Sequence, residues 1–283
     1  MQNRLPYFDY LLAAFAKGQS FLEDSFGHHV HWGYWAFPEQ AKPDHADFAA
    51  AAENLSLYII TAARVTNQQA VLDVGCGFGG TIASLNSHFE GMALTGLNID
   101  ERQLERARQR VTPLDSNSIV FQQGDACALP FADNSFDAVL AVECIFHFPS
   151  REKFFAEAYR VLKPGGYLAL SDFLLTKKLS RFDKFKFSQY LSNGFFGGCD
   201  VQFTPADYAA LATKTGFSVE LADNINENTL PTYRYLRSLV KESGFLKLSS
   251  LSDLNIGLTV LSVEFFSKIQ ALKYFVFAFK KPE

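Results

Sequence analysis

The spacing of apolar and polar positions changes along the chain, most clearly from Gln69 onward. Short apolar, β-branched runs typical of buried strands alternate there with stretches of helical periodicity. The strand-like runs occupy residues 70–75, 92–99, 118–125, 135–142 and 167–173. Helical segments begin near Gly80 and fill residues 100–110 and 151–162. This alternation predicts βαβ units and a doubly wound α/β sheet with five parallel strands.

The pattern beyond this region predicts two later strands. Residues 204–217 read as a capped helix, because Thr204 and Pro205 begin the segment and Gly216 comes near its end. Residues 218–224 and 271–281 show strand patterns, with further helices between them. The sheet should therefore gain two strands after a long interruption.

Two aromatic-rich segments flank this core, which comprises residues 69–173 and 204–283. Residues 1–68 predict a mostly helical N-terminal cover. Residues 174–203 form an insertion whose glycines in "SNGFFGG" are suited to a lid. Residues 229–270 predict an additional helical cap. None of these segments shows an internal repeat.

Composition narrows the class of protein. The 283 residues are 48% hydrophobic and 20% charged, as in globular proteins, and the net charge of -4 provides no basic field for nucleic acid. The start of the chain holds only the short apolar run "LLAAFA", so we expect a cytoplasmic protein without membrane insertion. The four cysteines form no CxxC pair, which argues against a zinc ribbon. The expected partner is a small molecule, with a homodimer possible in principle.

A glycine-rich turn, "VLDVGCGFGG", joins the first strand to the first helix of the core. Gly75, Gly77 and Gly80 fit the GxGxxG of dinucleotide sites, while Asp73, Gly75, Gly77 and Gly79 fit the pattern of S-adenosylmethionine sites. An aspartate at the strand tip would repel a pyrophosphate but attract the ammonium group of a methionine moiety. Asp125, after the third strand, offers a carboxylate to an adenine amino group. Both aspartates favour the methyl donor.

A family resemblance is carried by several motifs over residues 70–172. The segments "VLDVGCGFGG", "GLNIDERQLERA", "GDACALPFADNSFDAV", "VECIFHFP" and "EAYRVLKPGGYLALSD" occur in this order. In these motifs the chain resembles the class I S-adenosylmethionine-dependent methyltransferases. Within that class it is similar to the small-molecule group of sugar and natural-product O-methyltransferases and of tocopherol and sterol C-methyltransferases. The resemblance implies a Rossmann-like sheet of seven strands with the last strand antiparallel, and S-adenosylmethionine as cofactor.

The expected ribose contacts depart from the usual pattern of the class. The tip of the second strand usually carries an acid, but this chain has Asn98 there, with Gln103 at a position where the subgroup often has glutamine. We expect both amides to contact the ribose, although Asn98 could equally cap the following helix. Ala126 and Ala141 complete the expected donor contacts.

Methyl transfer to a hydroxyl requires a base, and His147 is the first candidate. It follows the fourth strand, and Asp172 ends the fifth strand at the same edge of the sheet, so the carboxylate would orient the imidazole. The resemblance to sugar O-methyltransferases implies the same pair. Alternatively, His147 packs in a loop and Asp172 only caps or pairs. Glu143 is a weaker second candidate.

The stretch "HHVHWGYW" at residues 28–35 is expected to cover the methyl-transfer chamber. A metal site is disfavoured because no cysteine or acid cluster accompanies its histidines. The expected acceptor contacts are aromatic: Trp32, Tyr34, Phe146, Phe195 and Phe196. Together they predict a lipophilic or ring-bearing acceptor.

The sequence thus predicts methyl transfer from S-adenosylmethionine to a hydroxyl of a secondary metabolite such as a glycoside, polyketide or nonribosomal peptide. C-methylation of an isoprenoid or sterol-like acceptor is the first alternative. An NAD-dependent oxidoreductase is a distant one, disfavoured by Asp73 and Asp125. A non-catalytic donor-binding scaffold would keep the glycine turn but would have no use for His147 and Asp172.

Overall fold

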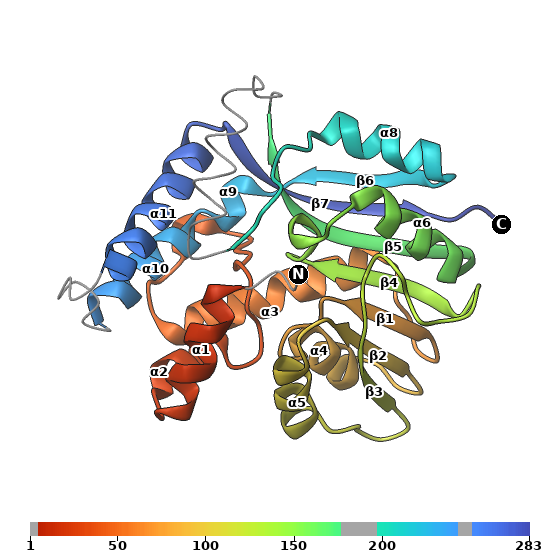
Figure 1. The fold of residues 1–283 in the computed structure, drawn as a ribbon, viewed down its shortest axis with the longest axis horizontal. Helices are drawn as coiled ribbons and strands as arrows, with labels where there is room; N and C mark the ends of the chain where they lie inside the picture. Colours follow the sequence, from red (N-terminus) through yellow and green to blue (C-terminus); the bar gives the residue numbers. More distant parts are fainter. Residues whose placement is uncertain (1–4, 177–196, 243–250) are drawn as a thin grey trace.

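A twisted sheet of seven strands forms the centre of the computed structural model, which describes residues 5–176, 197–242 and 251–283 (Figure 1). The strand order is β3-β2-β1-β4-β5-β7-β6. The pairs among β1 to β5 are parallel, whereas β7 runs antiparallel to both β5 and β6. The strands are β1 (Ala70–Val74), β2 (Ala93–Asn98), β3 (Ser118–Gln123), β4 (Phe136–Val142), β5 (Leu162–Leu175), β6 (Ser218–Asn224) and β7 (Leu272–Lys280).

Helices cover both faces of the sheet. They are α1 (Pro6–Ala16), α2 (Ser20–Phe26), α3 (His45–Ala62), α4 (Gly80–His88), α5 (Glu101–Arg110), α6 (Arg151–Val161), α8 (Pro205–Thr215), α9 (Asn226–Thr229), α10 (Pro231–Glu242) and α11 (Leu251–Lys268). Short 3-10 turns, η1 (Pro38–Gln40) and η2 (Ile145–His147), complete the list.

Alternation along the strands explains this layering. Val71 of β1 joins a core cluster with residues of α3, α4 and α5, whereas its neighbour Leu72 joins a second cluster with residues of α6 and α8. Successive side chains of a strand point to opposite faces, so an uninterrupted apolar run requires helices on both sides. The prediction of a doubly wound α/β sheet with an antiparallel last strand is confirmed.

The carboxyl edge of the sheet is covered by the N-terminal and C-terminal helices. In Figure 1, α1, α2, α10 and α11 lie on the left, the side at which the parallel strands end. Helices α1 to α3 fall within residues 1–68. Strand β5 extends to Leu175, beyond the expected start of the insertion. Within the described ranges, we find no helix with the length and hydropathy needed to span a bilayer.

Part of the predicted lid lies outside the described residues. These begin again at Gly197, so Phe195 and Phe196 are not placed. The expected acceptor contacts of these two phenylalanines therefore remain predictions.

Candidate active site

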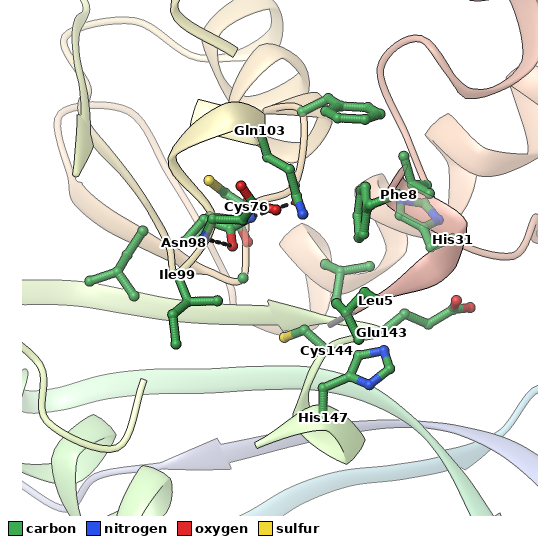
Figure 2. Close-up of a pocket in the computed structure, with 18 of the residues that line it drawn as sticks. Leu5, Phe8, His31, Cys76, Asn98, Ile99, Gln103, Glu143, Cys144 and His147 are labelled. Carbon is green, nitrogen blue, oxygen red and sulfur yellow. Dashed lines mark hydrogen bonds between the residues drawn. The ribbon is translucent and has the colours of Figure 1, made fainter. Parts of the chain in front are cut away.

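A cavity of about 730 Å³ lies at the carboxyl ends of β1, β2 and β4, the edge at which doubly wound sheets bind ligands. Its walls come from α1, residues 28–31, the glycine turn after β1 and the segments that follow β2, β3 and β4. Figure 2 shows Asn98 and Gln103 on one side of this space, with Glu143 and His147 on another. One cavity therefore joins the residues expected to hold the donor and those expected to act on the acceptor.

The turn after β1 requires glycine for conformation and for space. Gly75 and Gly77 have φ values of 75° and 53°, which other residues rarely adopt. A Cβ added to Gly75 would lie 2.7 Å from the Cβ of Cys144, closer than such atoms come. The Gly75 amide donates to the Leu97 carbonyl at 2.7 Å, which ties the turn to β2. Bare backbone is thus brought to the cavity wall, as close approach of a donor requires.

Gly79, which was expected to contact the donor, packs away from the described cavity. Gly79 precedes α4 with φ 84°, and a Cβ there would lie 3.1 Å from the Phe121 ring and 3.2 Å from Ala107. It therefore packs against β3 and α5, and the described cavity lining contains Gly80 instead. Gly79 shapes the turn from behind without contacting the cavity.

Asp73 lies at the bottom of the turn, 2% exposed, and lines the cavity. Burial raises the pKa of its carboxyl to about 7, because a charged group loses the stabilisation of water. An ammonium group placed beside this carboxylate would compensate for the lost hydration and favour its ionised form. The residue fits the amino group of a methionine moiety.

Asn98 and Gln103 lie together in the cavity wall. The Asn98 amide donates to the Gln103 side-chain oxygen at 2.9 Å, and its own oxygen accepts the Asp100 backbone N–H at 3.2 Å. Asp100, not Asn98, caps α5 by accepting the Arg102 N–H at 3.0 Å. Both amides are therefore held at the wall, where amide groups can donate and accept with ribose hydroxyls.

Of the remaining residues expected to contact the donor, two line the cavity and one does not. Asp125 and Ala126 follow β3 and line the cavity, and the Asp125 carboxylate accepts the Cys127 N–H at 2.8 Å. Ala141 is completely buried in β4 and packs in the cluster formed with α6 and α8. Ala141 therefore lies in the core behind the cavity.

His147 ends the 3-10 turn η2 after β4 and lines the cavity. Its Nδ1 lies 3.0 Å from the Gly198 carbonyl, and because a carbonyl can only accept, Nδ1 carries the hydrogen. Burial lowers the pKa of the imidazole to about 4, so the ring is neutral near pH 7. The Tyr7 ring of α1 stacks beside it at 6.2 Å between centroids.

Asp172 does not form the predicted hydrogen bond to His147. It is fully buried, and its Oδ2 accepts from Arg151 at 2.9 Å and from the Tyr208 hydroxyl at 2.5 Å. Its Oδ1 has no hydrogen-bond partner among the described residues. The prediction overlooked Arg151, which begins α6 and places a guanidinium behind β5. Asp172 is the counter-charge of this arginine rather than the direct partner of the imidazole.

Comparisons with known proteins identify the family. A family model described as a methyltransferase domain matches residues 72–170. Methyltransferase GfsG of Streptomyces halstedii is 32% identical over 222 residues, which cover 76% of this chain and 75% of that protein. The chain belongs to the class I S-adenosylmethionine-dependent methyltransferases of small molecules. S-adenosylmethionine is the cofactor, and the glycine turn and Asp73 fit it.

Two further similarities concern methyltransferases of different specificity. The 27-O-demethylrifamycin SV methyltransferase of Amycolatopsis mediterranei is 27% identical over 264 residues, 93% of each chain. A structure of geranyl diphosphate C-methyltransferase from Streptomyces coelicolor, with Mg²⁺, geranyl diphosphate and S-adenosyl-L-homocysteine, has a TM-score of 0.71. It covers 98% of both chains at 15% identity and shows the fold alone.

Glu143 is a second acid in the cavity of this methyltransferase. It has a positive φ of 47°, and its carboxylate accepts the Trp32 N–H at 2.8 Å. Burial raises the pKa of Glu143 to about 8, and hydrogen bonds from Tyr274 and from the Trp32 backbone oppose this rise. The group is therefore mostly protonated near pH 7 and ties residue 32 to the end of β4.

The aromatic residues expected to contact the acceptor pack mainly against one another. The Trp32 ring meets Phe173 edge-on at 5.2 Å, and Tyr34 stacks on Tyr58 at 5.1 Å. Phe146 is buried between His147 and Phe173. The described cavity lining contains none of Trp32, Tyr34 and Phe146. Their contact with the acceptor therefore stays a prediction.

Two histidines of "HHVHWGYW", His29 and His31, form a buried hydrogen-bonded chain at the cavity wall, whereas His28 is exposed. His29 Nε2 lies 2.7 Å from a Glu53 carboxylate oxygen, and His29 Nδ1 lies 3.1 Å from His31 Nε2. His31 Nδ1 donates to the Trp32 carbonyl at 2.9 Å. Glu53 of α3 is thus a structural partner that the linear sequence did not reveal.

Helix α1 lines one side of the methyltransferase cavity and lies within the helical N-terminal cover that the sequence predicted. Phe8 packs edge-on against Phe78 at 5.3 Å, and Asp9 pairs with Arg102 of α5 at 2.9 Å. Arg106 of α5 lies over the Phe15 ring at 4.1 Å. The aromatic content of "PYFDYLLAAFA" was a usable signal, but only the fold shows which helix it meets.

Proposed function

We propose that this methyltransferase transfers the methyl group of S-adenosylmethionine to a hydroxyl of a lipophilic or ring-bearing small molecule. The donor supplies an electrophilic methyl group on its sulfonium. The chain's own residues must hold the two reactants in line, exclude water and accept one proton from the hydroxyl. A polyketide, glycoside or nonribosomal peptide is the favoured class of acceptor, in keeping with the name of one relative, the 27-O-demethylrifamycin SV methyltransferase.

The proposal rests on the tautomer and the protonation state of His147. Its Nδ1–H donates to the Gly198 carbonyl, so in the neutral ring the lone pair belongs to Nε2. The lowered pKa of about 4 makes it a weak base in the ground state. That strength is sufficient, because the hydroxyl proton becomes strongly acidic as the new carbon–oxygen bond forms. The low pKa also keeps the basic form present across the physiological range.

The test is to replace His147 by alanine and to measure turnover and donor binding separately. Turnover of a labelled donor with a panel of hydroxylated polyketides and glycosides should fall by about a hundredfold or more, the typical value of a general base. Binding of S-adenosylhomocysteine, measured by calorimetry, should change little. His88→Ala is the control, because His88 is exposed at the end of α4. Unchanged turnover in His147→Ala would remove the base assignment.

C-methylation is the second candidate, and the aromatic wall favours it. Tyr7, Phe8 and Phe148 line the cavity near His147, and aromatic faces stabilise cations such as a developing carbocation. NMR of the product decides between the candidates, because an O-methyl group and a C-methyl group have separate carbon shifts. A C-methyl product whose formation survives His147→Ala would favour this candidate.

A further inference from the structure

Arg151 lies at the centre of a buried polar cluster behind the cavity. Its guanidinium is 1% exposed and donates to Asp172 and to the Asp200 carboxylate, each at 2.9 Å. It also donates to the Tyr208 hydroxyl at 3.1 Å and to the Asp200 carbonyl at 2.5 Å. The Phe203 ring packs over it at 4.5 Å. One positive charge thus joins α6, β5, α8 and the segment that leads back to α8.

The returning segment, residues 198–200, is held from two sides. Arg151 holds Asp200 by both its side chain and its carbonyl. From the opposite direction, the Asp200 N–H donates to the Phe146 carbonyl at 2.8 Å. The Gly198 carbonyl, two residues before Asp200, accepts from His147 Nδ1. The position of the carbonyl that His147 contacts therefore depends on where Arg151 fixes Asp200.

We propose that Arg151 and Asp200 are positioning residues that set the tautomer and orientation of His147 through the Gly198 carbonyl. Asp172 acts one step further away, as the buried counter-charge that keeps the guanidinium in place. The carbonyl selects the tautomer with hydrogen on Nδ1 and directs Nε2 as the proton acceptor. The effect on turnover rests on the proposed function of His147, whereas the effect on the tautomer does not.

Because its charges are balanced, we expect the loss of one charged side chain from the buried part of this cluster to destabilise the protein. A buried arginine whose partners are two carboxylates is well compensated, but either partner left alone would be an uncompensated charge. Asp200 is the tolerant position, since its side chain is 49% exposed. For the buried pair, Arg151→Met combined with Asp172→Asn removes both charges together.

The experiment measures the ring nitrogens of His147 by long-range ¹H–¹⁵N NMR on protein labelled at histidine, near pH 7. The wild type should show hydrogen on Nδ1. Asp200→Ala should shift the ring toward a mixture of tautomers, Asp200→Asn should retain the wild-type pattern in large part, and the double variant should show the largest shift. Turnover should fall roughly tenfold in Asp200→Ala, a part of what a general base contributes, with the donor KM unchanged.

Asp133→Ala is the matched control, because Asp133 is an exposed aspartate that pairs with Arg160 at 2.9 Å. It should change neither the tautomer nor the turnover. If His147 keeps the wild-type pattern in both Asp200→Ala and the double variant, the proposal is overturned. If the tautomer shifts while His147→Ala retains full turnover, the positioning stands and the base assignment fails.

Discussion

The two halves of the cavity are built in different ways. On the donor side, Asp73, Gly75 and Gly77 come from one turn, and its shape follows from residues adjacent in sequence. On the acceptor side, His147 is held by Gly198, and Asp172 meets Arg151 rather than the imidazole. The glycine turn on the donor side therefore depends on local backbone geometry, although Asn98, Gln103 and Asp125 come from other segments, while the position of His147 depends on contacts between distant segments.

This difference explains how one cofactor serves many acceptors within a family. A local turn keeps its function when surrounding segments change, since its requirements are glycine conformations and one carboxylate. Contacts between α6, β5 and residues 198–200 instead join separate segments, one of which leads back from the inserted region. Variation can thus reshape the acceptor half without loss of the donor site.

The largest effect is expected from Gly75→Ala, which breaks the donor half. The new Cβ would meet Cys144 at 2.7 Å and force a left-handed alanine. Such strain costs about 1–2 kcal/mol for the conformation and about 1–3 kcal/mol for overpacking. We expect donor affinity, measured by calorimetry, to fall by at least about a hundredfold, the equivalent of ~2.7 kcal/mol.

Gly18→Ala is the control for this change, because Gly18 also has a positive φ, 70°, but has no neighbouring atom within 4 Å of the added Cβ. It reports the conformational cost alone. A donor affinity in Gly75→Ala equal to that in Gly18→Ala would mean that the close approach of Cys144 is unimportant.

A smaller effect is expected from Asp73→Asn, which retains the shape of the donor half and removes one charge. Loss of a charge-assisted hydrogen bond costs about 1.5–3 kcal/mol, so donor affinity should fall about tenfold to a hundredfold. With a pKa of about 7 in the free protein, Asp73 loses its charge as the pH falls. Donor affinity should therefore weaken from about pH 7.5 to about pH 6 in the wild type. A similar slope in Asp73→Asn would assign the pH dependence to another group.

The smallest effect on the site is expected from Tyr34→Ala in the aromatic support. Tyr34 stacks on Tyr58 outside the described cavity lining, so its loss should lower the free energy of unfolding by about 1–2 kcal/mol. Donor affinity should change less than about threefold. Tyr7→Ala is the comparison, because Tyr7 lines the cavity. It should lower turnover, with little change in the free energy of unfolding. On both variants, urea titration measures the free energy of unfolding, calorimetry measures donor affinity, and an assay with labelled donor measures turnover.

Sequence periodicity was sufficient for the fold because the central strands β1, β4 and β5 are buried on both faces. Mostly apolar runs such as β1 and β4, each with one aspartate, have few alternatives once helical segments separate them. The glycine turn was predictable for a related reason, since its residues act through their own backbone. The spacing of the glycines within this one turn is therefore enough to predict it.

Hydrogen-bonded pairs of residues that are far apart in sequence could not be predicted in the same way. His147 and Asp172 were expected to meet because adjacent parallel strands bring their ends together, but Arg151 competes for the carboxylate. A buried arginine offers a stronger partner than a neutral imidazole. Glu53 meets His29 because α3 packs beside this segment, as the contact of Ser56 with the same ring shows. These choices depend on three-dimensional neighbours that no local pattern records.

The α1 cover also affects the order in which the protein folds. Phe8 and Asp9 meet their partners, Phe78 in the glycine turn and Arg102 of α5, only after these segments are placed by β1 and β2. Contacts between segments far apart in sequence form slowly, so we expect α1 to dock late. A chain caught before this step would have a formed sheet and an open donor site. We therefore expect completion of the cavity to be a late folding event, whose final contacts a bound donor would favour by mass action.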